Sequence, residues 1–86
     1  MNHMLLKGDE AYYDHVLDIA RQEVKIMSEE DKQHYLNHPD YDDHHFEYGM
    51  YLRNNYIYGK VKVLESDEMS EDIFEMIISL LKKDKA

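Results

Sequence analysis

A strongly apolar helix is predicted near the C-terminal end of the chain, and it constrains the fold more than any other segment. It is expected over residues 71 to about 83, with Ser70 as N-cap, acids at its start and lysines at its end. Its apolar side chains cover roughly half of the circumference or more at about 100° per residue. They are Ile73, Phe74, Met76, Ile77, Ile78, Leu80 and Leu81. Such a surface is typical of the central helix of a small bundle, or of a helix shared between a core and a dimer partner.

The chain has 86 residues and no cysteine, so this helix must stabilise a single small domain by packing alone. A chain of this length buries only about 60% of its unfolded surface, which leaves little room for a deep catalytic cavity. The absence of cysteine also excludes disulfides, thiolate nucleophiles, iron–sulfur clusters and cysteine-based zinc sites. A small binding domain is therefore favoured over an enzyme.

The charge balance narrows the class of partner. There are 19 acidic and 10 basic side chains, for a formal net charge of −9. This charge repels phosphate backbones and anionic lipids, so direct nucleic-acid binding and membrane binding are not expected. No segment approaches the roughly 18 apolar residues of a membrane span, and the start lacks the features of a signal peptide, so a cytoplasmic location is expected. The favoured partner is a basic protein, although the charge could serve solubility alone.

Hydrophobic periodicity elsewhere predicts a mainly α fold, a small bundle of three to four helices. The first helix is expected over residues 10 to 27, with Asp9 as its cap. Its apolar positions are Tyr13, Val16, Leu17, Ala20, Val24 and Met27. A second, short helix, with Ser28 as its cap, is expected to reach about Leu36, and Pro39 ends it.

The third helix is expected from Tyr41 or Asp42 to about Asn55. Asp40 precedes it as a cap, and Asn54 and Asn55 are candidate left-handed terminators. The alternating residues 60–64 that follow predict a short extended link or a minor hairpin arm.

The whole chain, residues 1–86, is interpreted as a single helical domain. Residues 1–8 are expected to be flexible. The pair at positions 3 and 4 matches what a common cloning site encodes, so residues 1–3 can be a cloning remnant.

A polar stripe is predicted on the packed face of the third helix. A wheel places on this face Leu52, His45, Tyr56, Gly49, Arg53, Phe46 and Met50. Glycine inside a helix costs about 1 kcal/mol relative to alanine, so Gly49 indicates close approach of a neighbouring backbone or a ligand. His45 and Arg53 lie one turn to either side of it. With Asn54 they form either a structural polar cluster that fastens this helix to an acidic loop or helix end, or an anion-binding site.

The opposite face of this helix is rich in tyrosine and carboxylate. Tyrosine is enriched at protein interfaces because it gives a large contact area at low entropic cost. The predicted partner-binding residues are Tyr48, Tyr51, Glu47, Asn55, Asp42 and Asp43. The alternative is that half-buried tyrosines close a small core.

The run His45-Phe46-x-x-Gly49-Met50-x-Leu52-Arg53-Asn54-Asn55 resembles the signature of a family of small, uncharacterised bacterial domains, His-Phe-x-x-Gly-x-x-Ile/Leu-Arg-Asn. The resemblance implies an acidic helical lead and a helical tail, together covering about residues 28–83. It implies no reaction, since the function of that family is not established. Family members continue with an aromatic residue and Gly-Leu-Trp, whereas residues 56–59 here are Tyr-Ile-Tyr-Gly.

Metal and enzyme chemistry have little support in the sequence. His34 and His38 are four residues apart with oxygen ligands nearby, which makes them weak metal candidates, but Pro39 interrupts the helix beside them. No phosphate-binding glycine loop or nucleophile elbow is present. We expect no catalytic residue and no cofactor.

The predicted function is that of a small acidic interaction protein that docks on a basic partner protein and inhibits or neutralises it, as immunity proteins, antitoxins and phage inhibitors do. One alternative is a small-molecule or metal-binding domain that uses His45 and Arg53. Another is a homodimeric structural domain.

Overall fold

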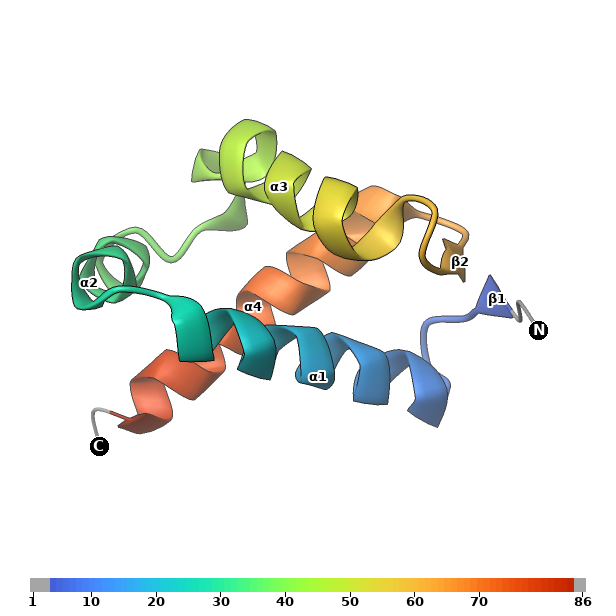
Figure 1. Ribbon diagram of the computed structural model, residues 1–86, viewed down its shortest axis with the longest axis horizontal. Coiled ribbons are helices and arrows are strands. Elements are labelled where there is room, and N and C mark those ends of the chain that lie inside the picture. Colours follow the sequence, from blue (N-terminus) through green and yellow to red (C-terminus); the bar gives the residue numbers. More distant parts are fainter. Residues whose placement is uncertain (1–3, 85–86) are drawn as a thin grey trace.

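The architecture is mainly α, as predicted, and the C-terminal helix is its centre. The computed structural model describes residues 4–84. Helix α4 (Ser66–Asp84) packs against α1 (Glu10–Ile26), α2 (Glu29–Asn37) and a third helical region, and it crosses α1 in the view of Figure 1. None of the helices described is both long and apolar enough to pass through a membrane.

The third helical region is wound unevenly. A 3₁₀ turn, η1 (Tyr41–Asp43), precedes a continuous helix of residues 45–57, called here the 45–57 helix. Only its central turn, α3 (Met50–Leu52), is α-helical, and π-helical turns flank it as η2 (His45–Gly49) and η3 (Arg53–Ile57). In these turns the amide of residue i donates to the carbonyl of residue i−5. Gly49 donates to the carbonyl of His44 and Tyr58 to that of Arg53, both at 2.8 Å.

This winding corrects the helical wheel. Phe46 is 81% exposed and Met50 is also exposed, although both were predicted on the packed face. A π turn contains more residues than an α turn, so positions calculated at about 100° per residue are wrong across it. The predicted asparagine terminators are also wrong, because the helix continues to Ile57 and Gly59 takes the left-handed conformation with φ 72°.

The extended segment after this helix pairs with the start of the chain. Strand β2 (Lys62–Val63) forms a parallel two-residue ladder with β1 (Met4–Leu5), in which Met4 faces Lys62 and Leu5 faces Val63. Of the N-terminal residues expected to be flexible, 1–3 lie outside the described part. The partner of the extended segment is therefore distant in sequence, and it is not a neighbouring hairpin arm.

The core forms around α4. This helix buries Met69, Ser70, Ile73, Phe74, Ile77, Ile78 and Leu81. The central position predicted for it is confirmed, but its start is not, because it begins at Ser66 with Asp67 and Glu68 in its first turn. Ser70 therefore lies inside the helix, fully buried, and is not a cap.

Helix α1 presents a slightly different face from the one predicted. Its buried residues are Tyr12, Val16, Ile19, Ala20 and Glu23. Tyr13 was predicted as the first buried position, but it is exposed, and its neighbour Tyr12 is buried instead. The same stripe ends on an acidic residue, Glu23, which lies near the C-terminal end of the helix.

Candidate functional site

Glu23 is a carboxylate buried among tyrosines. It is 3% exposed, and no lysine or arginine within residues 4–84 forms an ion pair with it. Its Oε1 accepts a hydrogen bond from the Tyr48 hydroxyl at 2.6 Å. Its Oε2 accepts bonds from Tyr51 at 2.9 Å and Tyr56 at 2.5 Å. Hydrogen bonds to an ionised acceptor are stronger than neutral ones, so three of them compensate for the loss of water around this charge.

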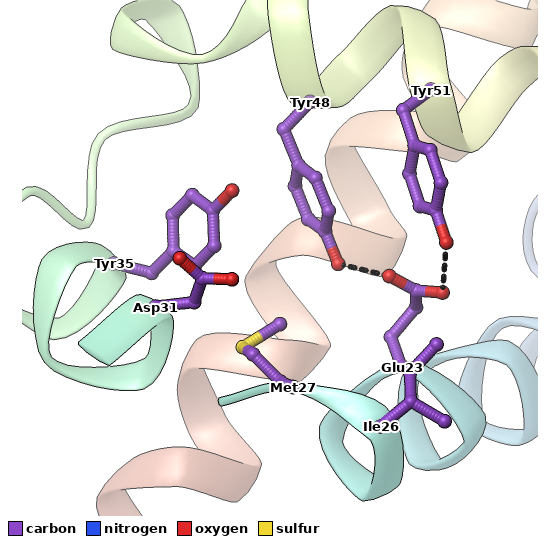
Figure 2. A pocket seen from close by; sticks show the side chains of 7 residues that line it. All are labelled: Glu23, Ile26, Met27, Asp31, Tyr35, Tyr48 and Tyr51. Atoms are coloured by element: carbon purple, nitrogen blue, oxygen red, sulfur yellow. Dashed lines mark hydrogen bonds between the residues drawn. The ribbon is translucent and has the colours of Figure 1, made fainter. Parts of the chain in front are cut away.

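A pocket of about 270 Å³ opens beside Glu23. It lies where the end of α1, the start of α2 and the 45–57 helix meet, as Figure 2 shows. We call this cavity the tyrosine pocket. It is lined by Glu23, Ile26, Met27, Asp31, Tyr35, Tyr48 and Tyr51. The volume is just below the roughly 300–1,000 Å³ of ligand pockets in general, so the pocket suits one side chain better than a large cofactor.

Three aromatic rings stand in a row along this pocket. Tyr35 stacks on Tyr48 with ring centroids 4.8 Å apart and planes at 28°. Tyr48 stacks on Tyr51 with centroids 5.6 Å apart and planes at 12°. Because each ring is held by its neighbour, the row is a rigid surface contributed by both α2 and the 45–57 helix.

The electrostatic environment of the pocket is negative. Burial raises the pKa of Tyr35, and the carboxylates of Asp31, Glu23 and Glu47 raise it further. Burial also raises the pKa of Tyr48, and its hydrogen bond to Glu23 adds to this effect. An additional negative charge is thus unfavourable in this pocket, and a positively charged group would be stabilised there.

These tyrosines make the stability of the fold sensitive to alkaline pH. Burial, followed by the hydrogen bond to Glu23, raises the pKa of Tyr48, Tyr51 and Tyr56 above the value of about 10 found in unfolded chains. Above pH 10 the unfolded chain therefore binds fewer protons than the folded one. The stabilisation is fully present below about pH 10 and is lost as the pH rises through the folded-state values.

We expect these phenols to ionise together with unfolding, in one cooperative step above pH 10. Circular dichroism and tyrosinate absorbance, followed through the same alkaline titration, measure both events. Tyr48→Phe should make the loss of stability with pH less steep, because one coupled phenol is removed. A chain that keeps its circular dichroism signal after all of its tyrosines have ionised would contradict the expectation.

The second polar cluster is centred on Arg53, which is 2% exposed. Its Nη1 donates to the Tyr41 hydroxyl at 3.0 Å and to Ser70 Oγ at 3.1 Å, and its Nη2 donates to the carbonyl of His45 at 3.2 Å. The guanidinium also lies 3.1 Å from the carboxylate of Asp67. Arg53 thus joins the 45–57 helix to the start of α4, and its donors are directed at groups of this protein.

The rest of the predicted polar stripe lies around this guanidinium. The His45 ring lies 3.7 Å from the Asp67 carboxylate. Gly49 is buried against the Tyr41 hydroxyl, whereas Asn54 is exposed. The structure therefore brings His45, Gly49 and Arg53 together around Tyr41 and does not bring Asn54 into the same cluster.

The predicted partner-binding residues divide into two groups. Glu47, Asn55, Asp42 and Asp43 are exposed on the surface. Tyr48 is half-buried and Tyr51 is 38% exposed, and both direct their hydroxyls to Glu23. Glu23, Asp31 and Tyr35 were not predicted from the sequence as site residues. The signal for Glu23 was available, because this acid stands one turn after Ile19 and Ala20 on the apolar face of α1.

His34, in α2, lies near His38, which directly follows that helix. The rings of His34 and His38 have centroids 5.1 Å apart, and both residues are exposed. Among the residues described, no three histidine or acidic side chains are arranged to hold a metal ion. His44 is buried, with its Nε2 2.7 Å from the carbonyl oxygen of His38.

Comparison of the chain with protein-family models, with curated proteins and with solved structures finds no match.

Proposed function

We propose that this protein is a non-enzymatic interaction protein that docks on a basic partner protein and neutralises or inhibits it. The observation that supports this best is the imbalance of charge between residues 29 and 57. Both fixed cations of this region are already engaged, Lys32 with Glu29 at 3.7 Å and Arg53 with Asp67 at 3.1 Å. The exposed carboxylates that have no such ion pair within residues 4–84 are Glu30, Asp31, Asp40, Asp42, Asp43 and Glu47.

A charged surface of this kind acts first on the rate of association. A basic partner is attracted over about 10 Å at 0.1 M ionic strength, and complementary charge can raise the association rate by one or more orders of magnitude. The same carboxylates repel acidic proteins and so suppress the binding of acidic competitors. The acidic surface therefore selects a class of partner before contact is made.

The acidic region between residues 29 and 57 also offers apolar contact area. Phe46 is 81% exposed and Met50 is exposed one turn further along the 45–57 helix. Large apolar and aromatic side chains contribute most of the binding energy in protein interfaces, whereas charges at the rim contribute mainly to rate and specificity. Phe46, which follows Asp42 and Asp43 and precedes Glu47 in the sequence, is the best candidate for an anchor of the complex.

The test begins with capture of a partner by the immobilised protein, its identification, and measurement of affinity with the purified pair. We expect the affinity to fall as salt rises from about 50 to about 500 mM, because exposed charges are screened. The triple variant Asp42→Asn, Asp43→Asn, Glu47→Gln should associate about tenfold more slowly than the wild type.

A matched variant separates local from overall charge. Glu10→Gln, Asp14→Asn and Asp18→Asn also remove three exposed carboxylates, but all three lie on α1. This control should retain most of the wild-type association rate. Equal losses in the two triple variants, or an affinity independent of salt, would contradict the proposed docking surface.

A further inference from the structure

We propose that the tyrosine pocket receives one basic side chain, an arginine or a lysine, of the partner protein. This inference rests on the proposed function and adds the position at which a single cationic group is bound. It differs from the general attraction of an acidic surface, because it requires a particular cavity and particular acceptors.

The pocket contains two carboxylates with unused capacity. Asp31 is exposed at the start of α2, and its carboxylate has no ion pair with any residue between 4 and 84. Glu23 Oε1 accepts one tyrosine bond and Oε2 accepts two. A carboxylate offers about four acceptor positions, so one on Oε1 remains for a further donor. The carboxylates come from different helices, as Figure 2 shows, so a cation between them would be held from two sides.

The aromatic rings suit the same occupant. A cation within about 6 Å of a tyrosine ring is attracted by its negative face, and a guanidinium also stacks on aromatic planes. Tyr48 is stacked between Tyr35 and Tyr51 (Figure 2), so this attraction is available at the two outer rings. The row of Tyr35, Tyr48 and Tyr51 is already fixed by stacking, so little order is lost when a ligand binds.

The remaining wall suits the aliphatic part of a basic side chain. Met27 and Ile26 line the pocket beside the acids, and Ile26 is 70% exposed. Arginine and lysine bury their methylene stems against apolar surface while their charge stays at a polar group. The volume of about 270 Å³ is consistent with one such side chain.

Packing within the protein explains only part of this arrangement. The three tyrosine hydroxyls account for the burial of Glu23. Asp31, at the opposite wall, is also favourable in the first turn of α2, but its carboxylate forms no ion pair within residues 4–84, and the isoleucine at the edge is exposed. The pocket therefore has the features of a binding site for a cationic side chain, and no lysine or arginine within residues 4–84 forms an ion pair with its two carboxylates.

The test uses N-acetyl-arginine amide as the probe and two-dimensional NMR as the readout. We expect saturable shifts of the signals of Met27, Asp31, Tyr35, Tyr48 and Tyr51. N-acetyl-citrulline amide is the matched control, because it has nearly the same shape and no charge, and it should not produce these shifts. Asp31→Asn should weaken binding of the arginine probe about fivefold.

Glu30→Gln is the matched variant for Asp31→Asn. Glu30 is exposed on the same first turn of α2 but does not line the pocket, so both variants change the net charge and the helix terminus equally. The Glu30→Gln protein should bind the probe like the wild type. Both variants can be checked for retained fold by their thermal transitions.

Three results would overturn the inference: equal binding of the citrulline probe, equal effects of the two α2 variants, or shifts spread over the acidic surface and absent from the pocket. Any of these could be obtained while the protein partner still binds with strong salt dependence. The proposed docking function would then stand without this pocket. Loss of salt dependence in the protein complex, with the arginine probe still bound in the pocket, would instead contradict the proposed function.

Discussion

Gly49→Leu should leave the protein without a cooperative thermal transition. A Cβ at position 49 would lie 2.5 Å from the Tyr41 hydroxyl oxygen and 3.1 Å from Arg53 Nη1. Tyr41 is buried, and its hydroxyl is bonded to Ser70 Oγ at 2.6 Å and to Arg53. Neither neighbour can move aside without breaking this buried cluster. Overpacking of a core costs about 1–3 kcal/mol or more, and the branched leucine side chain adds further clashes.

Gly49→Ala gives the same test in a milder form. Alanine gains about 1 kcal/mol over glycine in helix propensity, so a stabilised protein would be expected if the site were open. We expect instead a loss of about 1–3 kcal/mol in urea denaturation. In a Tyr41→Phe background the hydroxyl oxygen is absent, so the same substitution should cost less.

Met50→Leu is the matched control, because Met50 is the next residue of the helix and is exposed. It should change the free energy of unfolding by less than about 0.5 kcal/mol. Two results would show that the Tyr41 hydroxyl does not limit the space at Gly49. One is that Gly49→Ala stabilises the protein. The other is that Gly49→Ala costs the same free energy of unfolding in the wild type and in the Tyr41→Phe background.

The sequence predicted the apolar framework well, because burial follows hydrophobic periodicity. Ile73, Phe74, Ile77 and Leu81 were expected at the centre of the bundle and are buried there. The N-cap at Ser28 was also predicted, and its Oγ accepts a bond from the amide of Asp31 at 3.1 Å. Such features depend on residues that are close together in the chain, so a local pattern is sufficient to identify them.

Polar residues whose partners are distant in sequence were harder to place. Ser70 looked like a helix cap, but its hydroxyl meets Tyr41 and Arg53, which come from other elements. The π turns, which rotate Phe46 and Met50 to the surface, have no recognised signature in this segment. Tyr48 and Tyr51 were correctly placed on one face, but their common acceptor, Glu23, is more than twenty residues earlier in the chain.

That acceptor provides the second large expected effect. Glu23→Ala should destabilise the protein by about 3 kcal/mol, because hydrogen bonds to a charged group contribute about 1.5–3 kcal/mol each and are not additive. The three tyrosine hydroxyls would lose their acceptor, and a cavity would remain under the 45–57 helix. Asp18→Ala, on the exposed side of the same helix, should cost less than about 0.5 kcal/mol.

Glu23→Gln separates the charge of this residue from its hydrogen bonds. Glutamine fills nearly the same volume and keeps one carbonyl oxygen as acceptor, so no cavity forms, but its amide nitrogen cannot accept from a tyrosine. We expect a free energy of unfolding between those of the wild type and Glu23→Ala, measured by urea denaturation. If Glu23→Gln is as stable as the wild type, the negative charge is not needed to hold the tyrosines. If Glu23→Ala costs no more than Asp18→Ala, the buried carboxylate does not stabilise the fold at all. Only this second result would locate the stability of this region in the stacking of the rings instead.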